Sequence, residues 1–354
     1  MIGHIARAEG APTPTIVLDG TRLPRDEARL RPVLTVIRKW LDGIGQGHVL
    51  KIALVSPSAH PLFDLDYQFV QALPGGPDLF DFQGSCGHSI LASVISAEER
   101  NWLPRLAPGG RVRVKVLNNG DHVVCEVDEA RRRSGSFTVH FLQDTEVRLR
   151  DLLLTGRPTD QLVTRFGVHE ASLVSMGNPY VFVDARGLGL EDEPALFTAG
   201  DDVYERLLSI REAAADLLNW PRTGTFPKIA ALGCYAPGRL SVRAVSVPKW
   251  HPSVALTGTI CLTAATGIAG TVPARLAQEA GMARDFLEIE TVSGGTAAKA
   301  SVAPAAGGAA DGSDDVLHWV SVSRKLAQLT APTDIVPLRD YHYQEDPACL
   351  PLTV

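Results

Sequence analysis

The chain has 354 residues, of which 45% are hydrophobic and 21% charged, a composition typical of a globular protein with a full core. At about 150 residues per domain, this length predicts two domains or one large domain. The 34 Lys and Arg residues against 40 Asp and Glu residues give a net charge of −6, with no basic run interleaved with aromatic residues. We therefore expect a small molecule, and no nucleic acid, as the partner.

The amino terminus and the cysteines bear on the compartment and on metals. Residues 1–10 lack the apolar run of a secretory signal and the Arg/Ser-rich pattern of a transit peptide. The five cysteines are an odd number and include no C-x-x-C pair, which predicts neither a disulfide framework nor a zinc site. We therefore expect a cytoplasmic protein without a metal.

The first half of the chain predicts short strands with helices inserted. Apolar residues at three- and four-residue steps predict an amphipathic surface helix over residues 30–43. Residues 111–116 alternate apolar and basic side chains, and Asn119-Gly120 should turn this strand into a hairpin. The strands predicted in this half are residues 15–19, 49–55, 111–116, 123–127 and 136–142.

The second half repeats this mixture of elements. Another amphipathic surface helix is predicted over residues 203–217. An Ala- and Gly-rich run over residues 294–313 predicts a long flexible loop, and the weakly patterned residues 326–354 are assigned no structure. The strands predicted in this half are residues 180–184, 228–232, 240–245 and 317–322.

Two further helical segments, residues 87–96 and 251–269, are uncharged and apolar on every side, which is typical of helices enclosed by protein. The stretch from 250 to 274 has no Asp, Glu, Lys or Arg and is long enough to span a bilayer. Its threonines, glycines and prolines favour a helix buried in protein instead, so we expect no membrane partner.

These two helices divide the chain into comparable halves. Each half would hold strands around one central helix, and the start of that helix would face the other half. We predict an α+β protein with domains at residues 1–160 and 161–325. A tail over residues 326–354 follows, for which packing back on the first domain is one option.

A cysteine stands between glycines where the first buried helix should begin, in Gly84-Ser85-Cys86-Gly87-His88. Glycines let a ligand approach the backbone, and a helix start offers free N–H groups and lowers the pKa of a nearby thiol. A free cysteine is more often a core residue. The flanking glycines reverse that preference here and favour a reactive thiol beside an anion site.

The second buried helix should open in a comparable way at Trp250-His251-Pro252-Ser253. Pro252 suits the first helical position, and His251 or Ser253 can cap the helix or contact a ligand. A merely structural, hydrogen-bonding histidine is an equally favoured interpretation. The motif at Asn178, Gly-Asn-Pro, taken alone predicts only a turn.

A further signal comes from ordered blocks along the chain: KIALVSPS at 51–58, DYQF at 66–69, GSCG at 84–87, GNPYVFV at 177–183, IREAA at 210–214, PKIA at 227–230 and TGTIC at 257–261. Together these blocks resemble the PrpF family, whose members include methylaconitate isomerase and 4-oxalomesaconate tautomerase and share the fold of diaminopimelate epimerase. The similarity covers most of residues 1 to 325, and blocks in the family's order are more specific than any single one.

This resemblance implies a diaminopimelate epimerase-like fold with two similar domains, each a barrel-like, mainly antiparallel sheet around a buried helix, and an active site in the cleft between them. It also implies a cofactor-independent isomerase or tautomerase that moves a proton across the allylic system of an unsaturated carboxylate. The family's acid–base pair falls on Lys51 and Cys86. Such chemistry needs a base and a proton donor whose pKa values lie near the working pH; which of the two residues is the base stays open.

Substrate contacts follow from the resemblance and the motifs together. Backbone amides at the starts of the two buried helices would hold substrate carboxylates and the dienolate that forms. We expect no cofactor, and either a monomer or a homodimer. The substrate-binding candidates are Ser85, Gly87, His88, Asn178, His251 and Ser253.

The sequence departs from the family pattern where substrate should bind. An expected Arg-Gly-Gly-Thr-Ser-Lys-Gly is RAEGAPT at 7–13, and the amides of Gly-Asn-Cys-Gly-Asn are replaced in GSCGH at 84–88. An expected His-Pro-Ser-Gly is TVSG at 291–294, and Arg-Thr-Ala-Arg-Arg is SVSRK at 321–325. These changes predict the same proton chemistry on a larger or less charged acid than methylaconitate.

Two other classes of function stay open. A cyclase or lyase of specialised metabolism could use the same cleft, and so could a non-catalytic binding or accessory protein. Deuterium uptake from D₂O separates the isomerase from the cyclase, and the reactivity of the Cys86 thiol separates enzyme from binding protein. A Cys/His hydrolase is disfavoured, because no nucleophile elbow or oriented His–Asp set can be named.

Overall fold

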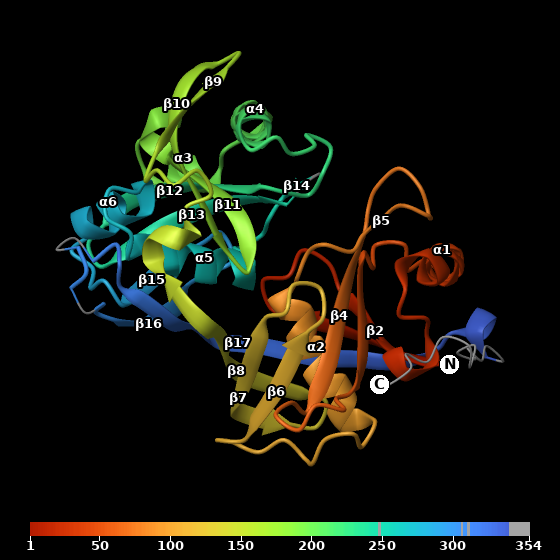
Figure 1. Ribbon diagram of the computed structural model, residues 1–354. Helices are drawn as coiled ribbons and strands as arrows, with labels where there is room; N and C mark the ends of the chain where they lie inside the picture. The colour runs from red at the N-terminus through yellow and green to blue at the C-terminus, as the bar shows by residue number, and fades with distance from the viewer. Residues whose placement is uncertain (247–248, 306, 310–311, 340–354) are drawn as a thin grey trace, which may run out of the picture.

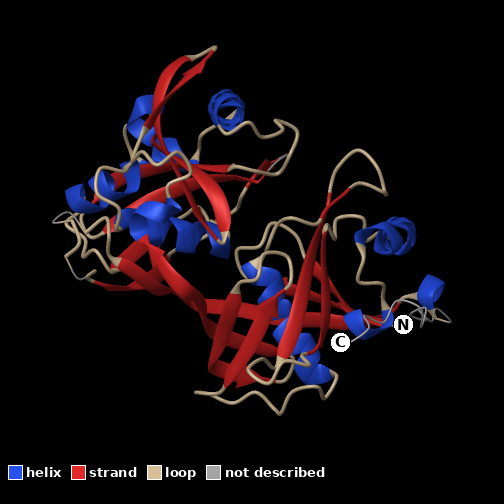
Figure 2. Cartoon of the chain, in the orientation of Figure 1, coloured by secondary structure: helices blue, strands red, loops and turns tan. Residues whose placement is uncertain are grey.

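The computed structural model describes residues 1–339 apart from 247–248, 306 and 310–311. Two lobes are visible in Figure 1, one built from the first half of the chain and the other mostly from the second. Strands dominate both lobes, with a helix running inside each curled sheet (Figure 2). This arrangement confirms the predicted α+β class.

Eight strands close the barrel of the first lobe, seven from the first half of the chain and β17 from near its end. Hydrogen-bonded neighbours run in the order β1-β2-β3-β4-β6-β7-β8-β17 and back to β1. The pairs β2/β3 and β4/β6 are parallel, and the others are antiparallel. The bounds are β1 Ile2–Ala8, β2 Thr15–Asp19, β3 Lys51–Pro57, β4 Leu65–Ala72, β5 Phe80–Asp81, β6 Arg111–Val116, β7 His122–Arg131, β8 Ser134–Arg148 and β17 Val316–Asp334.

The second half repeats this order of pairing. Strands β10 to β13 follow the pattern of β1 to β4, with β11/β12 parallel in place of β2/β3 and β13/β15 parallel in place of β4/β6. Strand β16 then joins β15 to β17. The bounds are β9 Asp160–Thr164, β10 Gly167–Met176, β11 Asn178–Asp184, β12 Lys228–Ala236, β13 Arg239–Ser246, β14 Lys249–Trp250, β15 Phe286–Glu290 and β16 Thr296–Ala303.

Six α-helices and four short 3-10 helices lie between the strands of the described residues. The α-helices α2 and α5 occupy corresponding places in the two halves, as do α1 and α4. The bounds are α1 Glu27–Gly43, α2 Gly87–Glu99, α3 Glu193–Phe197, α4 Asp201–Leu217, α5 Leu256–Thr266 and α6 Val272–Glu279, with 3-10 turns at Gly20–Arg22, Ala185–Leu188, Val336–Leu338 and Leu149–Leu152.

The enclosed helices predicted from apolar composition are confirmed. Every residue of α5 is buried, as is α2 from Gly87 to Ala97. Helix α2 packs against β1, β2, β3 and β17, and α5 against β10, β11, β16 and β17. No helix among the described residues is both long and apolar enough to cross a membrane.

The two amphipathic helices lie on the surface, as predicted, and cover the outer faces of the parallel strand pairs. Helix α1 buries Leu30, Leu34 and Ile37 against Ile52 and Leu54 of β3. Helix α4 makes the same kind of contact with β12. Full burial of one such aliphatic side chain contributes on the order of 1.5–3 kcal/mol, so these stripes fix both helices firmly.

The second buried helix begins later than the sequence predicts. Helix α5 starts at Leu256, so Pro252 is not its first residue and neither His251 nor Ser253 caps it. The segment before it bends and stays outside the helix because its polar groups have other partners. The Ser253 N–H donates to His251 Nδ1 at 3.1 Å, and Ser253 Oγ donates to the Gly10 carbonyl at 3.2 Å.

Two segments predicted without regular structure contain strands. Residues 296–303, inside the predicted flexible loop, form β16, because its small residues pair with β15 on one side and β17 on the other. Strand β17 continues past position 325, and its residues 327–334 pair with β1. Both strands are decided by their neighbours and not by a local alternating pattern; residues 340–354 lie outside the described part.

The close approach of the two buried helices gives a test. A Cβ atom on Gly87 would lie 2.6 Å from Leu256 Cβ, closer than real Cβ contacts. Gly87→Ala should therefore lower the free energy of unfolding by about 1–3 kcal/mol, measured by urea denaturation. Gly43→Ala, where nothing lies within 4 Å of the new methyl group, is the control and should not destabilise the protein. Equal denaturation midpoints for the two variants would contradict the close packing.

Candidate functional site between the two halves

Lys51 lies on the inner face of the first barrel. It is the first residue of β3, and because side chains alternate along a strand it shares a face with Ala53, which belongs to the core around α2. It lies opposite Thr15 of β2, whose hydroxyl is hydrogen-bonded to Ser89 in the first turn of α2 at 2.8 Å. The Lys51 side chain is 6% exposed. The strand therefore places this amine near the start of α2.

Cys86 is the residue that precedes α2, and its side chain makes no capping hydrogen bond. Its carbonyl accepts the Tyr67 hydroxyl at 3.1 Å and the amides of Ser89 and Ile90 at 2.9 and 3.1 Å. These bonds fix the backbone and leave the thiol available. The exposed fraction of Cys86 is 9%.

Charges around Cys86 outweigh its burial. Burial raises the pKa of the thiol, but the Lys51 ammonium, hydrogen bonds from Ser89 and the Lys228 ammonium bring it below the ordinary value of 9.0. Cys125 is buried without charged neighbours, and its pKa is raised to about 12. At Cys261 the effect of burial is larger than that of the backbone hydrogen bonds, and the pKa is again raised to about 12. Among the described cysteines with a shifted pKa, Cys86 alone has one favouring the thiolate.

Asn178 ties the Cys86 loop to the second half. Its Nδ2 donates to the Ser85 carbonyl at 3.1 Å and to Thr257 Oγ1 of α5 at 2.9 Å, and the Ser85 N–H donates to its Oδ1 at 3.4 Å. The amide is 2% exposed and engaged on both sides by protein. Its contacts are therefore those of a positioning residue, whereas the buried Ser85 hydroxyl has no hydrogen-bond partner.

Two neutral imidazoles come from the two halves. The rings of His88 and His251 stack with centroids 6.5 Å apart. Burial, reinforced by Lys51 and Lys325, holds the pKa of each well below 6.5. Among the described residues, neither ring nitrogen of His88 has a hydrogen-bond partner of ordinary geometry. A contact with the Glu9 backbone raises the pKa of His88 and so opposes the effect of burial.

A cavity of about 530 Å³ opens between the halves beside these groups. Lys51, Ser85, Lys228 and the exposed Lys249 line it. The remaining wall is mainly apolar and comes from both halves of the chain. The apolar side chains in it include Leu50, Phe69, Leu73, Phe226, Ile229, Val245 and Trp250.

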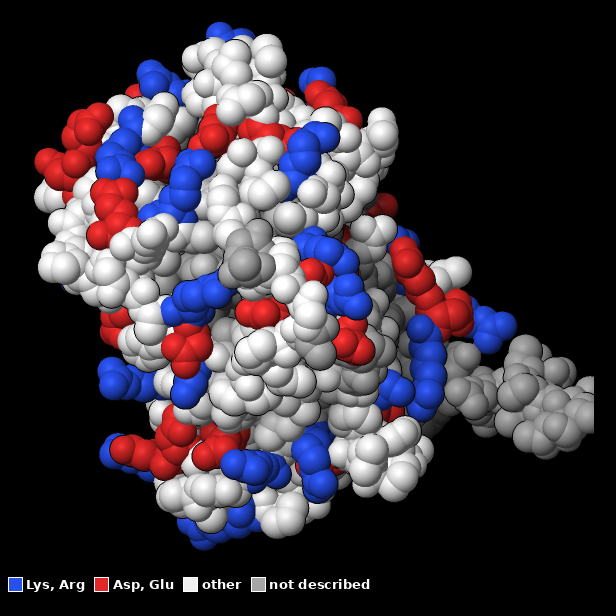
Figure 3. Space-filling model, turned by 60° about the vertical axis from the view of Figure 1, so that its left-hand side comes forward, with Lys and Arg blue, Asp and Glu red and all other residues white. Residues whose placement is uncertain are grey.

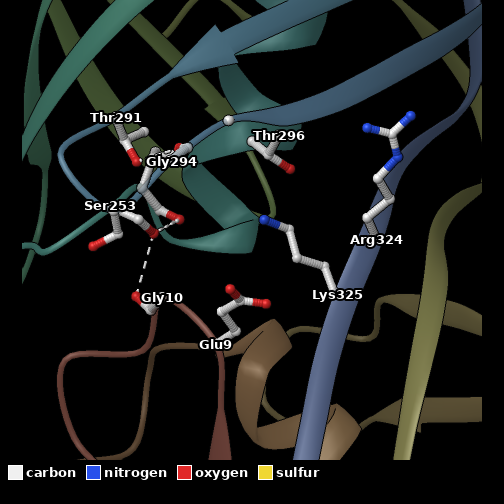
Figure 4. Close-up of a pocket in the computed structure, with 11 residues that line it drawn as sticks. Glu9, Gly10, Ser253, Thr291, Gly294, Thr296, Arg324 and Lys325 are labelled. Carbon is white, nitrogen blue, oxygen red and sulfur yellow. Dashed lines mark hydrogen bonds between the residues drawn. The ribbon is translucent and has the colours of Figure 1, made fainter.

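A smaller pocket of about 70 Å³ adjoins Ser253 and the Glu9-Gly10 loop. Lys325 of β17 and Glu9 direct their side chains into it, as Figure 4 shows. A bulge in β17 at Arg324, whose φ is +57°, shifts the register ahead of Lys325. Burial lowers the pKa of Lys325 to about 8.

All eight predicted site residues therefore lie where the halves meet. Lys51 and Ser85 line the larger cavity and Ser253 lines the smaller pocket. The other five, Cys86, Gly87, His88, Asn178 and His251, are buried and line neither. The sequence analysis missed three polar residues there: Lys228, Lys325 and Thr257. Lys228 and Thr257 lie in blocks quoted for the resemblance, and Lys325 in one of the altered motifs, so that signal was present. No three His, Cys, Asp or Glu side chains of the described chain lie close enough to share a metal ion.

One face of the molecule has mixed charge. Basic and acidic side chains are interspersed on the face shown in Figure 3, with no continuous area of one sign. Many charged side chains of the described residues are paired, as Arg186 is with Asp184 and Glu279. This face offers no broad basic surface of the kind that binds nucleic acid.

Solved structures confirm the predicted diaminopimelate epimerase-like fold. A methylitaconate-delta-isomerase structure superposes with a TM-score of 0.64 at 20% identity and covers 94% of this chain and 95% of that one. A hydroxyproline epimerase from Agrobacterium vitis, with bound trans-4-hydroxy-L-proline, gives a TM-score of 0.59 at 14% identity over 93% and 92% of the two chains.

Sequence comparison gives the family. The 3-methylitaconate isomerase of Eubacterium barkeri is 26% identical over 312 residues, 75% of this chain and 82% of that protein. The 4-oxalomesaconate tautomerase of Pseudomonas putida is 26% identical over 294 residues, 76% and 80% of the two chains. The sequence profile described as PrpF protein matches residues 18–310. Because that match covers most of the chain, this protein belongs to the PrpF family.

Proposed function

We propose that this protein is a cofactor-independent isomerase that moves a proton across the allylic system of an unsaturated carboxylate. The observation that carries the proposal is the Cys86 thiol with its lowered pKa, next to the Lys51 ammonium and a helix start, beside a cavity between the halves. Two relatives named as an isomerase and a tautomerase support the same reaction class.

In the proposed reaction the Cys86 thiolate is the base and the Lys51 ammonium is the acid. The thiolate takes a proton from the allylic carbon, and the electrons of that C–H bond form a new double bond. The displaced π electrons pass through the dienolate to the far carbon, which takes a proton from Lys51. The double bond has moved, no electrons are gained or lost, and a return of the proton from Cys86 to Lys51 completes the cycle.

The remaining site residues would bind and orient the substrate. Amides at Gly87 and His88 and the Ser85 hydroxyl would hold the developing negative charge, because a helix start favours an anion. The neutral rings of His88 and His251 can donate a hydrogen bond without competing for the proton. Asn178 and Ser253 would hold the loops that carry these groups.

The walls of the cavity support a substrate that differs from a small tricarboxylate. Phe69, Leu73, Phe226 and Trp250 give it mainly apolar surface. A substrate with an apolar substituent on the unsaturated acid would gain burial there, at about 25 cal/mol for each Å² removed from water. This agrees with the altered motifs near the amino terminus and at Cys86.

Deuterium uptake tests the reaction class. Incubation in D₂O with 3-methylitaconate, 4-oxalomesaconate and alkyl- or aryl-substituted analogues should give an isomerised product that carries deuterium, detected by mass spectrometry and NMR. Cys86→Ala and Lys51→Met should each lower turnover by about 10²- to 10⁴-fold, because each removes one proton-transfer group. Cys234→Ala, which changes a cysteine outside the site, should retain activity.

Two outcomes would contradict this function. An unlabelled product together with full turnover by Lys51→Met would favour the cyclase or lyase. Absence of turnover on every compound, with a Cys86 thiol as inert as that of Cys125, would favour the binding protein.

The pH dependence of thiol alkylation tests the electrostatics separately. The pKa of Cys86 lies below 9.0, so its thiolate persists at a lower pH than the thiolate of an ordinary cysteine. As the pH is lowered, the rate at which Cys86 reacts with iodoacetamide should therefore fall later than the rate of an ordinary cysteine. Lys51→Met removes the main favourable charge and should move the inflection to higher pH. Burial raises the pKa of Cys234, which serves as the internal comparison. If the rate of alkylation of Cys86 has its inflection at a pH equal to or above that of Cys234, the Lys51 ammonium does not stabilise the Cys86 thiolate.

A further inference from the structure

The internal repeat gives Lys51 a counterpart in the second half. Lys51 is the first residue of β3, which pairs in parallel with β2 and follows the outer helix α1. Lys228 is the first residue of β12, which pairs in parallel with β11 and follows the outer helix α4. Each strand directs its second and fourth residues to its outer helix. Both lysines therefore lie on the face that looks toward the buried helix of their own half.

Lys228 lies at the same cavity as Lys51. Both lysines line it together with Ser85, and the Lys228 ammonium favours the thiolate of Cys86, as that thiolate in turn favours the ammonium. The ammonium also lies 5.9 Å from the centre of the Phe226 ring. The two halves thus contribute one amine each to the neighbourhood of a single thiol.

The loop that leads into Lys228 is held rigidly. Arg211 of α4, which is 4% exposed, donates to the carbonyls of Arg222 at 3.0 Å, Gly224, and Phe226 at 3.4 Å. The Thr225 hydroxyl donates to the Asp81 carboxylate of the first half. The start of β12 is therefore fixed relative to both halves, as a binding group requires.

Neither lysine forms a salt bridge. Among the described residues, no Asp or Glu oxygen lies within 4 Å of the nitrogen of Lys51 or Lys228, although many surface arginines are paired with carboxylates. Burial lowers the pKa of Lys228, and the charges of Cys86 and of Asp81, which lines the same cavity, offset only part of that effect. Two buried cations without a salt-bridge partner beside one cavity are favourable for binding an anion.

We propose that Lys228 binds the carboxylate of the substrate and keeps it next to Cys86, while the apolar part of the substrate lies along the apolar wall of the cavity. The site would take a carboxylic acid with a single charged end at this position and an apolar substituent. The identity of the substrate in this assignment rests on the proposed function, whereas the existence of the anion site does not.

Two alkylating reagents that differ in charge test the anion site without a known substrate. Iodoacetate is an anion and iodoacetamide is neutral, so the ratio of their rate constants at Cys86, measured by peptide mass spectrometry, reports positive charge beside the thiol. Lys228→Met should lower this ratio about 3- to 10-fold, because a loss near 1.4 kcal/mol of attraction is tenfold in rate. A change in thiol pKa alone alters both rates together and leaves the ratio unchanged.

Matched variants separate charge from structure. Lys228→Arg keeps the charge and should restore most of the ratio. Lys249→Met removes an exposed lysine that lines the same cavity but, unlike Lys228, is not among the charges that lower the pKa of Cys86, and it should leave the ratio as in the unaltered protein. Where Lys228→Met does not fold, as judged by circular dichroism, Lys228→Gln takes its place. If Lys228→Met, Lys249→Met and the unaltered protein all give the same ratio of rate constants, the assignment is wrong.

The result is independent of the isomerase test. If deuterium enters the product but Lys228→Met leaves both the ratio and the KM of that reaction unchanged, the isomerase stands and the role of Lys228 fails. If no compound is turned over but the ratio falls, the anion site stands and the isomerase fails. With a turned-over acid, Lys228→Met should raise KM more than it lowers kcat, because the charge contacts the carboxylate in substrate and transition state alike.

Discussion

The structure depends on the contact between the starts of two buried helices. Gly87 of α2 lies against Leu256 of α5 with no room for a methyl group, and the Asn178 amide joins the Ser85 carbonyl to the Thr257 hydroxyl. An unsatisfied buried amide or carbonyl costs about 1–3 kcal/mol, so this hydrogen-bonded bridge specifies one arrangement of the halves. The helix start that carries Cys86 thereby faces the other half instead of solvent.

That contact determines the electrostatics of the site. Because the halves meet there, Lys51 of β3 and Lys228 of β12 both act on one thiol, and the stacked rings of His88 and His251 feel the charges of Lys51 and Lys325. Cations held close together are unfavourable, and a thiolate or bound carboxylate relieves the repulsion. The same burial keeps the imidazoles neutral. This arrangement supports the proposed anion binding and the proposed proton transfer between sulfur and nitrogen.

The repeat also explains why the two halves differ in chemistry. The first half places a thiol directly before its buried helix, whereas the corresponding residue of the second half is Ala255. The second half instead contributes a lysine at the start of β12, an imidazole at His251 and most of one cavity wall. One fold used twice thus brings the Cys86 thiol of one half near Lys228 of the other, as the proposed division of roles requires.

The sequence by itself determined the elements whose pattern is local. Alternation specified strands such as Arg111–Val116, apolar composition specified the enclosed helices, and the blocks around Lys51 and Cys86 indicated the family and the chemical pair. Tertiary structure decided what depends on neighbours. Strand β16 and the end of β17 form because partner strands satisfy their backbone groups, α5 begins at Leu256 because the preceding polar groups bond elsewhere, and Lys228 meets Cys86 because the halves dock. Residues 142 positions apart carry no local signal of such a meeting, since only packing brings them together.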